Sequence, residues 1–194
     1  VMNRISKFEL MDQGLENEEI LRTVPGSRYH SGGRLEFGPD GKLYATTGDA
    51  NNPIEAATNR SYLGGKILRM NTDGSVPEDN PFENSTVYSQ GHRNPQGIAW
   101  EPDTGDLYNS EHGPWRYDEI NRVVPGGNYG WGHYNCGDVT KVPGSEKGFE
   151  EFREPVRCFK NWTIAPSGMT FVNDTSSPWH GDLFLTGLRG RQVY

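Results

Sequence analysis

The chain has 194 residues, 25 of them glycine, and a formal net charge of −7 at pH 7. This acidic balance disfavours binding to DNA or RNA, which needs a basic face, and it suits small neutral partners. No apolar run approaches the roughly 20 residues of a membrane-spanning helix, and no signal peptide is visible.

A pattern of short strands and turns recurs three times, over residues 33–48, 97–111 and 168–185. In each unit, two segments with alternating apolar positions flank a turn with Asp and Gly, which is the pattern of a β-hairpin. A third strand is expected after each of the first two units, at 66–70 and 119–123.

Partial strands stand at both ends of the chain. Residues 4–8 look like the third strand of a preceding unit, and residues 191–194 look like the start of one in the last unit. We interpret residues 13–21 as the loop between adjacent strands. The repeating meander is typical of an all-β fold, the β-propeller, and no helical period is long enough to favour an α/β fold.

The repeat also predicts how the chain divides into blades. We expect an incomplete first blade over about residues 1–30, and blades over about 31–90, 91–160 and 161–194, the last incomplete. Because the chain begins and ends within strands, which leaves sheet edges open, we expect it to be an internal part of a larger propeller.

Polar side chains are concentrated on tight turns in four motifs, Gly-His-Arg-Asn-Pro-Gln-Gly at 91–97, Ser-Glu-His-Gly-Pro at 110–114, Asp-Glu-Ile-Asn at 118–121 and Asn-Tyr-Gly-Trp at 128–131. Binding residues often lie on such turns. In this order, the motifs resemble those of the soluble aldose sugar dehydrogenases of the glucose/sorbosone dehydrogenase family. The resemblance, which extends from residue 4 onward, implies a six-bladed quinoprotein propeller with pyrroloquinoline quinone (PQQ) and calcium, of which this chain would be about half.

The resemblance assigns catalytic roles to three residues. His30, in a His-x-x-Gly-Arg-Leu motif, corresponds to the family's general base, and Asp49 lies beside that base. Imidazole can accept a hydroxyl proton near neutral pH. Arg93 would stabilise charge on the quinone oxygen. Taken alone, the His and Asp could simply be turn residues, and the Arg could form a surface salt bridge.

Cofactor contacts are implied at six positions. Arg93 and Asn94 carry donors suited to the carboxylates and quinone oxygens of PQQ. The other positions that match cofactor contacts in the family are His112, Asp118, Thr163 and Arg189.

Two calcium sites follow from the same resemblance. The main-chain carbonyls of Gly113 and Pro114 would hold calcium at the cofactor, since calcium prefers oxygen ligands. Glu119 and the carbonyl of Tyr129 would hold a second, structural ion, although a Glu here could instead pair with a neighbouring blade. Gly132 replaces the Pro that usually follows the Asn-Tyr-Gly-Trp motif.

The implied activity is oxidation of the C1 hydroxyl of an aldose sugar to a lactone, with an external electron acceptor. We expect this part of the propeller to be inactive alone. Two alternatives remain: a calcium-binding extracellular propeller that acts as a non-catalytic binding or surface module, and a calcium-dependent hydrolase. The sugar, the acceptor and the oligomeric state stay open.

The cysteines and the possible N-glycosylation triplets indicate the cellular compartment of the protein. A disulfide between Cys136 and Cys158 is slightly favoured over two free thiols, and a metal site is disfavoured because neither belongs to a CxxC pair. Four Asn-x-Ser/Thr triplets, at 59, 84, 161 and 173, favour secretion without showing glycosylation. We therefore expect an extracellular or periplasmic protein.

Overall fold

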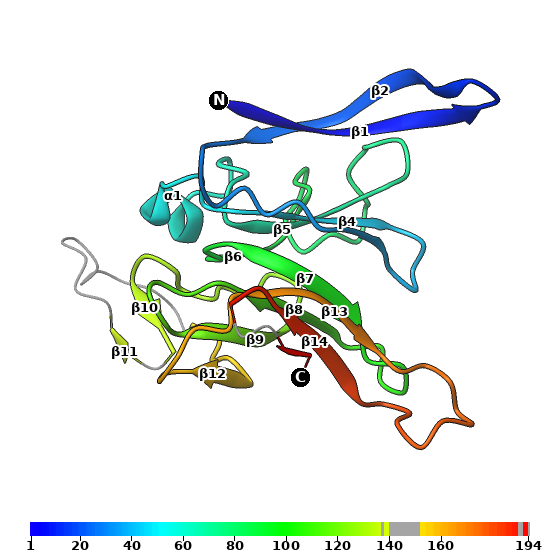
Figure 1. Cartoon of the computed structure of the whole chain (residues 1–194). Coiled ribbons are helices and arrows are strands. Elements are labelled where there is room, and N and C mark those ends of the chain that lie inside the picture. The colour runs from blue at the N-terminus through cyan, green and yellow to red at the C-terminus, as the bar shows by residue number, and fades with distance from the viewer. Residues whose placement is uncertain (137, 140–151, 190–191, 194) are drawn as a thin grey trace.

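The computed structural model describes residues 1–136, 138–139, 152–189 and 192–193. In this part of the chain, the regular structure is antiparallel β-sheet with one short helix, α1 (Pro53–Thr58). Figure 1 shows the sheets following one another from the N-terminal hairpin to the C-terminal strands. None of the described residues forms a helix with the length and apolarity to cross a membrane.

Each sheet is built mainly from strands that are consecutive in sequence. The N-terminal hairpin pairs β1 (Met2–Met11) with β2 (Gly14–Pro25). The next sheet has the order β3 (Leu35–Phe37), β4 (Leu43–Thr47), β5 (Lys66–Met70), β6 (Val87–Gln90).

The following sheet has the order β7 (Pro95–Trp100), β8 (Leu107–Glu111), β9 (Asp118–Val123), β12 (Arg157–Phe159). The last has β13 (Pro166–Phe171), β14 (Leu183–Gly187) and β15 (Gln192–Val193), and a short ribbon pairs β10 (Tyr134–Asn135) with β11 (Asp138–Val139).

The strands expected from the repeat are confirmed, including those at 66–70 and 119–123. The expected strand at 4–8 is part of β1, and that at 191–194 is described only at Gln192–Val193, its two outer positions lying outside the described residues. The blade limits drawn from the sequence stay a prediction.

The interpretation of residues 13–21 as a loop is wrong, because residues 14–25 form β2. This strand is mostly exposed and Glu-rich, so it lacks the apolar alternation by which a strand is recognised. Its pairing is supported instead by polar cross-strand contacts, such as Lys7 Nζ to Glu19 Oε2 at 2.5 Å and Ser6 Oγ to Glu18 Oε1 at 2.8 Å.

Two apolar clusters lie on opposite faces of the β3–β6 sheet. Leu68 packs with Ile5, Val24 and Met70 toward the N-terminal hairpin. The adjacent Ile67 packs on the other side with Ile98, Leu107 and Val123 of the next sheet. Successive side chains of a strand point to opposite faces, so β5 is buried on both sides. This packing fixes the sheets as layers and brings their connecting turns together.

Candidate active site

A cavity of about 480 Å³ lies where turns from successive sheets meet. Eight of the twelve residues expected from the sequence line it, together with three others. The lining residues are Arg28, Tyr29, His30, Arg93, Asn94, His112, Gly113, Trp115, Asp118, Thr163 and Arg189. Asp49, Pro114, Glu119 and Tyr129 are not among them.

Asp49 lies directly behind His30. The Nδ1 atom of His30 is 2.8 Å from Oδ1 of Asp49, whose side chain is 2% exposed, whereas that of His30 is 20% exposed. The two backbones approach closely, since a Cβ at Gly48 would stand 2.0 Å from the carbonyl oxygen of His30. Glycine at position 48 therefore permits the contact between the His30 turn and the end of β4.

The second oxygen of Asp49 is held by Trp131, whose Nε1–H donates to Oδ2 at 2.6 Å. The main-chain N–H of Asn51 donates to Oδ1 at 2.8 Å. A carboxylate held on both oxygens keeps a fixed orientation toward its histidine partner. Sequence reasoning identified the Asn-Tyr-Gly-Trp motif but assigned no role to its Trp.

Arg93 is half-buried between the cavity and the interior. Its main-chain N–H donates to Glu111 Oε2 at 3.2 Å, and one terminal nitrogen donates to the carbonyl of His112 at 3.1 Å. The guanidinium carbon lies 5.2 Å from the centre of the Trp131 ring. Burial lowers the pKa of Arg93 from its ordinary value, and its buried Nε has no hydrogen-bond partner among the described residues.

Asn94 joins two turns across the cavity wall. Its Oδ1 accepts the main-chain N–H of Gly32 at 3.1 Å and the Nε2–H of Gln96 at 3.0 Å. The side chain is largely buried, at 7% exposure. These bonds tie the turn after β6 to the segment that follows His30.

Asp118 organises the opposite wall. Its Oδ1 accepts the N–H of Gly113 at 3.0 Å, and its Oδ2 accepts the hydroxyl of Thr163 at 2.7 Å and the N–H groups of Ile164 and Ala165 at 2.8 Å each. Asp118 is 1% exposed. Its carboxylate thus fixes the positions of Gly113 and Thr163, and the expected cofactor contacts of Asp118 and Thr163 stay predictions.

Two further cavity residues differ in how firmly they are held. His112 Nε2 lies 2.8 Å from the carbonyl of Pro166, and burial lowers the pKa of this imidazole. Arg189 is exposed. Arg28, which sequence reasoning missed, adds a third guanidinium to the lining beside Arg93 and Arg189.

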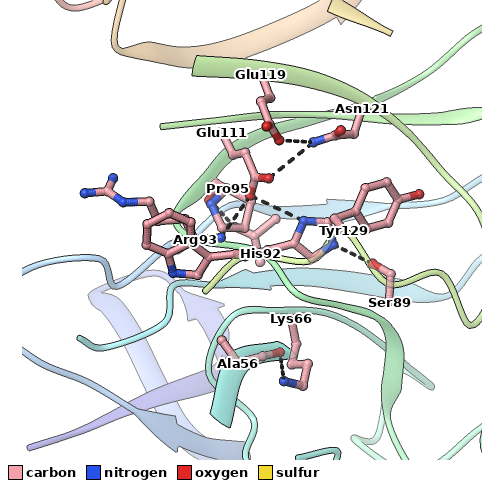
Figure 2. Close-up of polar contacts among 12 residues, drawn as sticks. Ala56, Lys66, Ser89, His92, Arg93, Pro95, Glu111, Glu119, Asn121 and Tyr129 are labelled. Atoms are coloured by element: carbon pink, nitrogen blue, oxygen red, sulfur yellow. Dashed lines mark hydrogen bonds and ion pairs between the residues drawn. The ribbon is translucent and has the colours of Figure 1, made fainter. Parts of the chain in front are cut away.

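Behind Arg93 lies a buried polar network (Figure 2). Glu111 Oε2 is 3.3 Å from Nδ1 of His92, whose Nε2 is 2.8 Å from the hydroxyl of Ser89. Burial lowers the pKa of His92 to about 3, so this imidazole is neutral. The His92 ring stacks on Tyr129 with ring centres 4.7 Å apart.

Glu111 and Glu119 are paired residues of neighbouring strands, and Asn121 donates to both, at 3.2 and 3.4 Å. The two carboxyls are buried close together, so burial raises the pKa of Glu111 to about 7, and burial and the neighbouring carboxyl raise that of Glu119 well above its ordinary value. Paired buried carboxyl oxygens are a donor set suited to a hard cation.

Side chains alone do not form an obvious metal centre. Among the described residues, no group of three or more His, Cys, Asp or Glu converges as metal ligands. The carbonyl of Pro114 accepts the N–H of Arg116 at 2.6 Å. A carbonyl oxygen has two lone pairs, so one lone pair of Pro114 is still available to a metal ion. Glu119 also accepts the N–H of Cys136 at 3.1 Å, and Cys136 is disulfide-bonded to Cys158.

The sheets and the polar cavity correspond to a known class of protein. The chain superimposes on the PQQ-bound aldose sugar dehydrogenase of Streptomyces coelicolor with a TM-score of 0.81 and 36% identity, over 98% of this chain and 53% of that one. Together with the match to the apo aldose sugar dehydrogenase of Escherichia coli, at a TM-score of 0.85, this shows about half of a six-bladed β-propeller.

The family follows from the sequence match. The whole chain, residues 1–194, matches the glucose/sorbosone dehydrogenase family, and it belongs to that family. It is 36% identical to the aldose sugar dehydrogenase YliI of Escherichia coli over 90% of this chain and 50% of that protein. It is 44% identical to quinoprotein glucose dehydrogenase B of Acinetobacter calcoaceticus over 58% of this chain and 28% of that protein. The chain therefore spans about half the length of its relatives or less.

Proposed function

We propose that the complete propeller containing this chain oxidises the C1 hydroxyl of aldose sugars to lactones, using PQQ and an external electron acceptor. The observation that carries this proposal is the His30–Asp49 pair, at 2.8 Å, on a cavity that Arg93 also lines. The names of the relatives support the same reaction class.

The cavity residues fit an anionic cofactor. Three guanidinium groups, from Arg28, Arg93 and Arg189, are among its lining residues. PQQ carries three carboxylates, and guanidinium forms charge-assisted hydrogen bonds to carboxylates. Arg93 and Asn94 would hold the cofactor, with Thr163 and His112 on the other wall. The buried Nε of Arg93 has no hydrogen-bond partner within the described part of the chain, so it is a donor that the cofactor could use.

In this reaction, His30 acts as the general base. Asp49 engages Nδ1, which fixes the ring orientation and leaves Nε2 to take the proton of the sugar hydroxyl. PQQ, when bound, supplies the two-electron acceptor for the hydride from C1. Arg93, which lines the cavity, would supply a positive charge to stabilise the negative charge that develops on the acceptor.

Calcium would occupy two places. Gly113 and Pro114 would contribute main-chain oxygens beside the cofactor, and Glu119 and Tyr129 would contribute to a second ion. The donor set behind Arg93 supports the second site, because a divalent cation relieves the repulsion between Glu111 and Glu119.

The disulfide between Cys136 and Cys158 supports an extracytoplasmic location, since such bonds persist in oxidising compartments.

The binding-module alternative is favoured by no specific contact among the described residues. A module need not keep a His–Asp pair behind a cationic cavity.

The test uses the complete protein reconstituted with PQQ and calcium. His30→Ala should retain PQQ affinity and lose sugar-dependent dye reduction by about 10²–10⁴-fold, the usual effect of removing a general base. Arg93→Ala should instead weaken PQQ binding, because it removes a charge-assisted contact. His180→Ala is the matched control, since it removes a peripheral histidine paired with Asp103.

Two results would contradict the proposal. Wild-type protein that takes up PQQ yet oxidises no aldose from a broad panel favours the binding module. Wild-type protein that takes up no PQQ shows that the cofactor assignment is wrong. The 194-residue chain alone should fail both assays.

A further inference from the structure

Trp115 is an unusual lining residue of the cavity. Its side chain is 93% exposed, although an indole ring gains free energy when it is buried. Among the described residues, the ring has no hydrogen-bond partner and no aromatic contact. Tyr29, the other aromatic residue among those that line the cavity, is less exposed, at 58%.

The backbone holds Trp115 in this position at a cost. Its φ is +62°, in the left-handed region that bulky residues rarely adopt. The N–H of Arg116 donates to the carbonyl of Pro114 at 2.6 Å, so Trp115 is the central residue of a three-residue turn. Strain of this kind costs on the order of 1–3 kcal/mol and is concentrated at functional sites.

Both ends of the turn are anchored. Gly113 donates its N–H to Asp118 Oδ1 at 3.0 Å, and Tyr117 donates its N–H to the carbonyl of Phe159 at 3.0 Å. The backbone within the turn is tightly packed, because a Cβ at Gly113 would stand 2.1 Å from the carbonyl oxygen of Tyr117. Trp115 is therefore displayed by a fixed turn at the cavity.

We propose that Trp115 contacts the substrate by stacking its indole face on the C–H face of an aldopyranose whose C1 hydroxyl is directed to His30. The inference rests on the proposed function and adds a binding residue to it. The negative face of an indole attracts the partially positive C–H hydrogens of a pyranose, while the equatorial hydroxyls stay hydrated. A flat apolar contact of this kind selects the ring form of the sugar without a charged group.

The experiment compares single variants of the complete protein loaded with PQQ and calcium, with D-glucose and maltose as substrates. Trp115→Ala should raise KM about 10-fold with kcat nearly unchanged, which is the size of effect expected for one aromatic contact. Trp115→Phe should stay within about threefold of wild type, because it keeps a ring face. PQQ affinity should be the same in all variants.

Trp179→Ala is the matched control. Trp179 is 59% exposed but packs on Phe184 in the β13–β14 hairpin, and it does not line the cavity. The KM of the Trp179→Ala variant should equal that of wild type. A KM for Trp115→Ala within twofold of wild type, or a loss of PQQ affinity in that variant, would overturn the inference.

A direct binding measurement separates this inference from the proposed function. If wild-type protein oxidises no aldose, the enzymatic proposal fails, and D-glucose affinity measured by calorimetry still decides the role of Trp115. Weaker binding by Trp115→Ala than by Trp179→Ala supports stacking. Equal affinities, or no binding by wild type, overturn it.

Discussion

At the scale of single residues, Lys66 places an amine in the protein interior with no exposed surface. Its Nζ donates to the carbonyl of Ala56 at 2.6 Å (Figure 2). It also donates to the carbonyl of Gly64 at 3.1 Å and approaches that of Glu55 at 3.5 Å. These bonds tie α1 to the start of β5. Ala56 also accepts the N–H of Gly91, so the tie reaches the turn that carries Arg93 and Asn94.

This environment predicts a pH dependence of stability. Burial lowers the pKa of Lys66 to about 7, whereas the unfolded chain has the ordinary value near 10.5. Between these values the unfolded state binds more protons, so the free energy of unfolding rises with pH, by at most about 1.4 kcal/mol per unit. In urea titrations from pH 7 to 9, wild type should therefore gain stability relative to Lys66→Met. Parallel curves would show that the three carbonyls keep the amine charged.

Single residues also show which parts of the candidate site could be predicted from the sequence. The positions of His30 and Arg93 at the cavity, with Asp49 beside His30, could be predicted because each residue stands in a motif that resembles the family, and their roles stay predictions. The contact of Trp131 with Asp49 and the place of Glu111 behind Arg93 could not, since they join residues far apart in the chain. Such contacts depend on how the sheets pack, and neither residue has a local pattern that indicates its partner.

At the scale of elements, the repeat and its apolar alternation found the strands of each hairpin, but they did not indicate β2 or β12, which lie outside the repeated pattern. β2 is mostly exposed, and β12 has three residues. α1 has six residues, too few to show a helical period. The sequence favoured a disulfide between Cys136 and Cys158, but only the structure shows that Cys158 lies in β12, at the edge of the sheet.

β12 is attached to the sheet by few contacts. Three residue pairs join it to β9, and Cys158 lies opposite Glu119 in that register. The disulfide links the same Cys158 to Cys136, whose N–H donates to Glu119. The bond therefore holds β12 and the carboxylate of Glu119 together.

Removing the disulfide should cost stability. A Cys136→Ser/Cys158→Ser variant should lose about 3 kcal/mol, the chain-entropy value for a crosslink over a loop of this length. Reduced wild type should match the variant in denaturant titrations, and adding reductant to the variant should have no effect. Mass spectrometry should confirm that the thiols of reduced wild type are free. If the reduced protein then keeps its full stability, the disulfide does not have this role.

At the scale of the whole molecule, the packed sheets make the calcium proposal testable through folding. Glu119→Gln should lower the melting temperature in calcium, because a ligand that binds the native state stabilises it. In chelator the same variant should be equal to wild type or more stable, since it removes one of two adjacent buried carboxyls. Calorimetry under both conditions measures the difference.

Glu36→Gln is the control for this comparison, because Glu36 is exposed in β3. It should behave like wild type in calcium and in chelator. An equal loss for Glu119→Gln in both conditions would identify Glu119 as a packing residue.

The cavity has a consequence for synthesis on the ribosome. Its walls come from turns of successive sheets, and its lining residues run in sequence from Arg28 to Arg189. A nascent chain that has emerged through Asp49, just after β4, contains both members of the His30–Asp49 pair, but it lacks Arg93, Asp118 and Thr163. If PQQ binds as proposed, the cavity residues that would hold it are complete only after the chain has been translated through Arg189. A ribosome stalled between Asp49 and Arg93 would therefore present the His30–Asp49 pair without any of the proposed cofactor contacts.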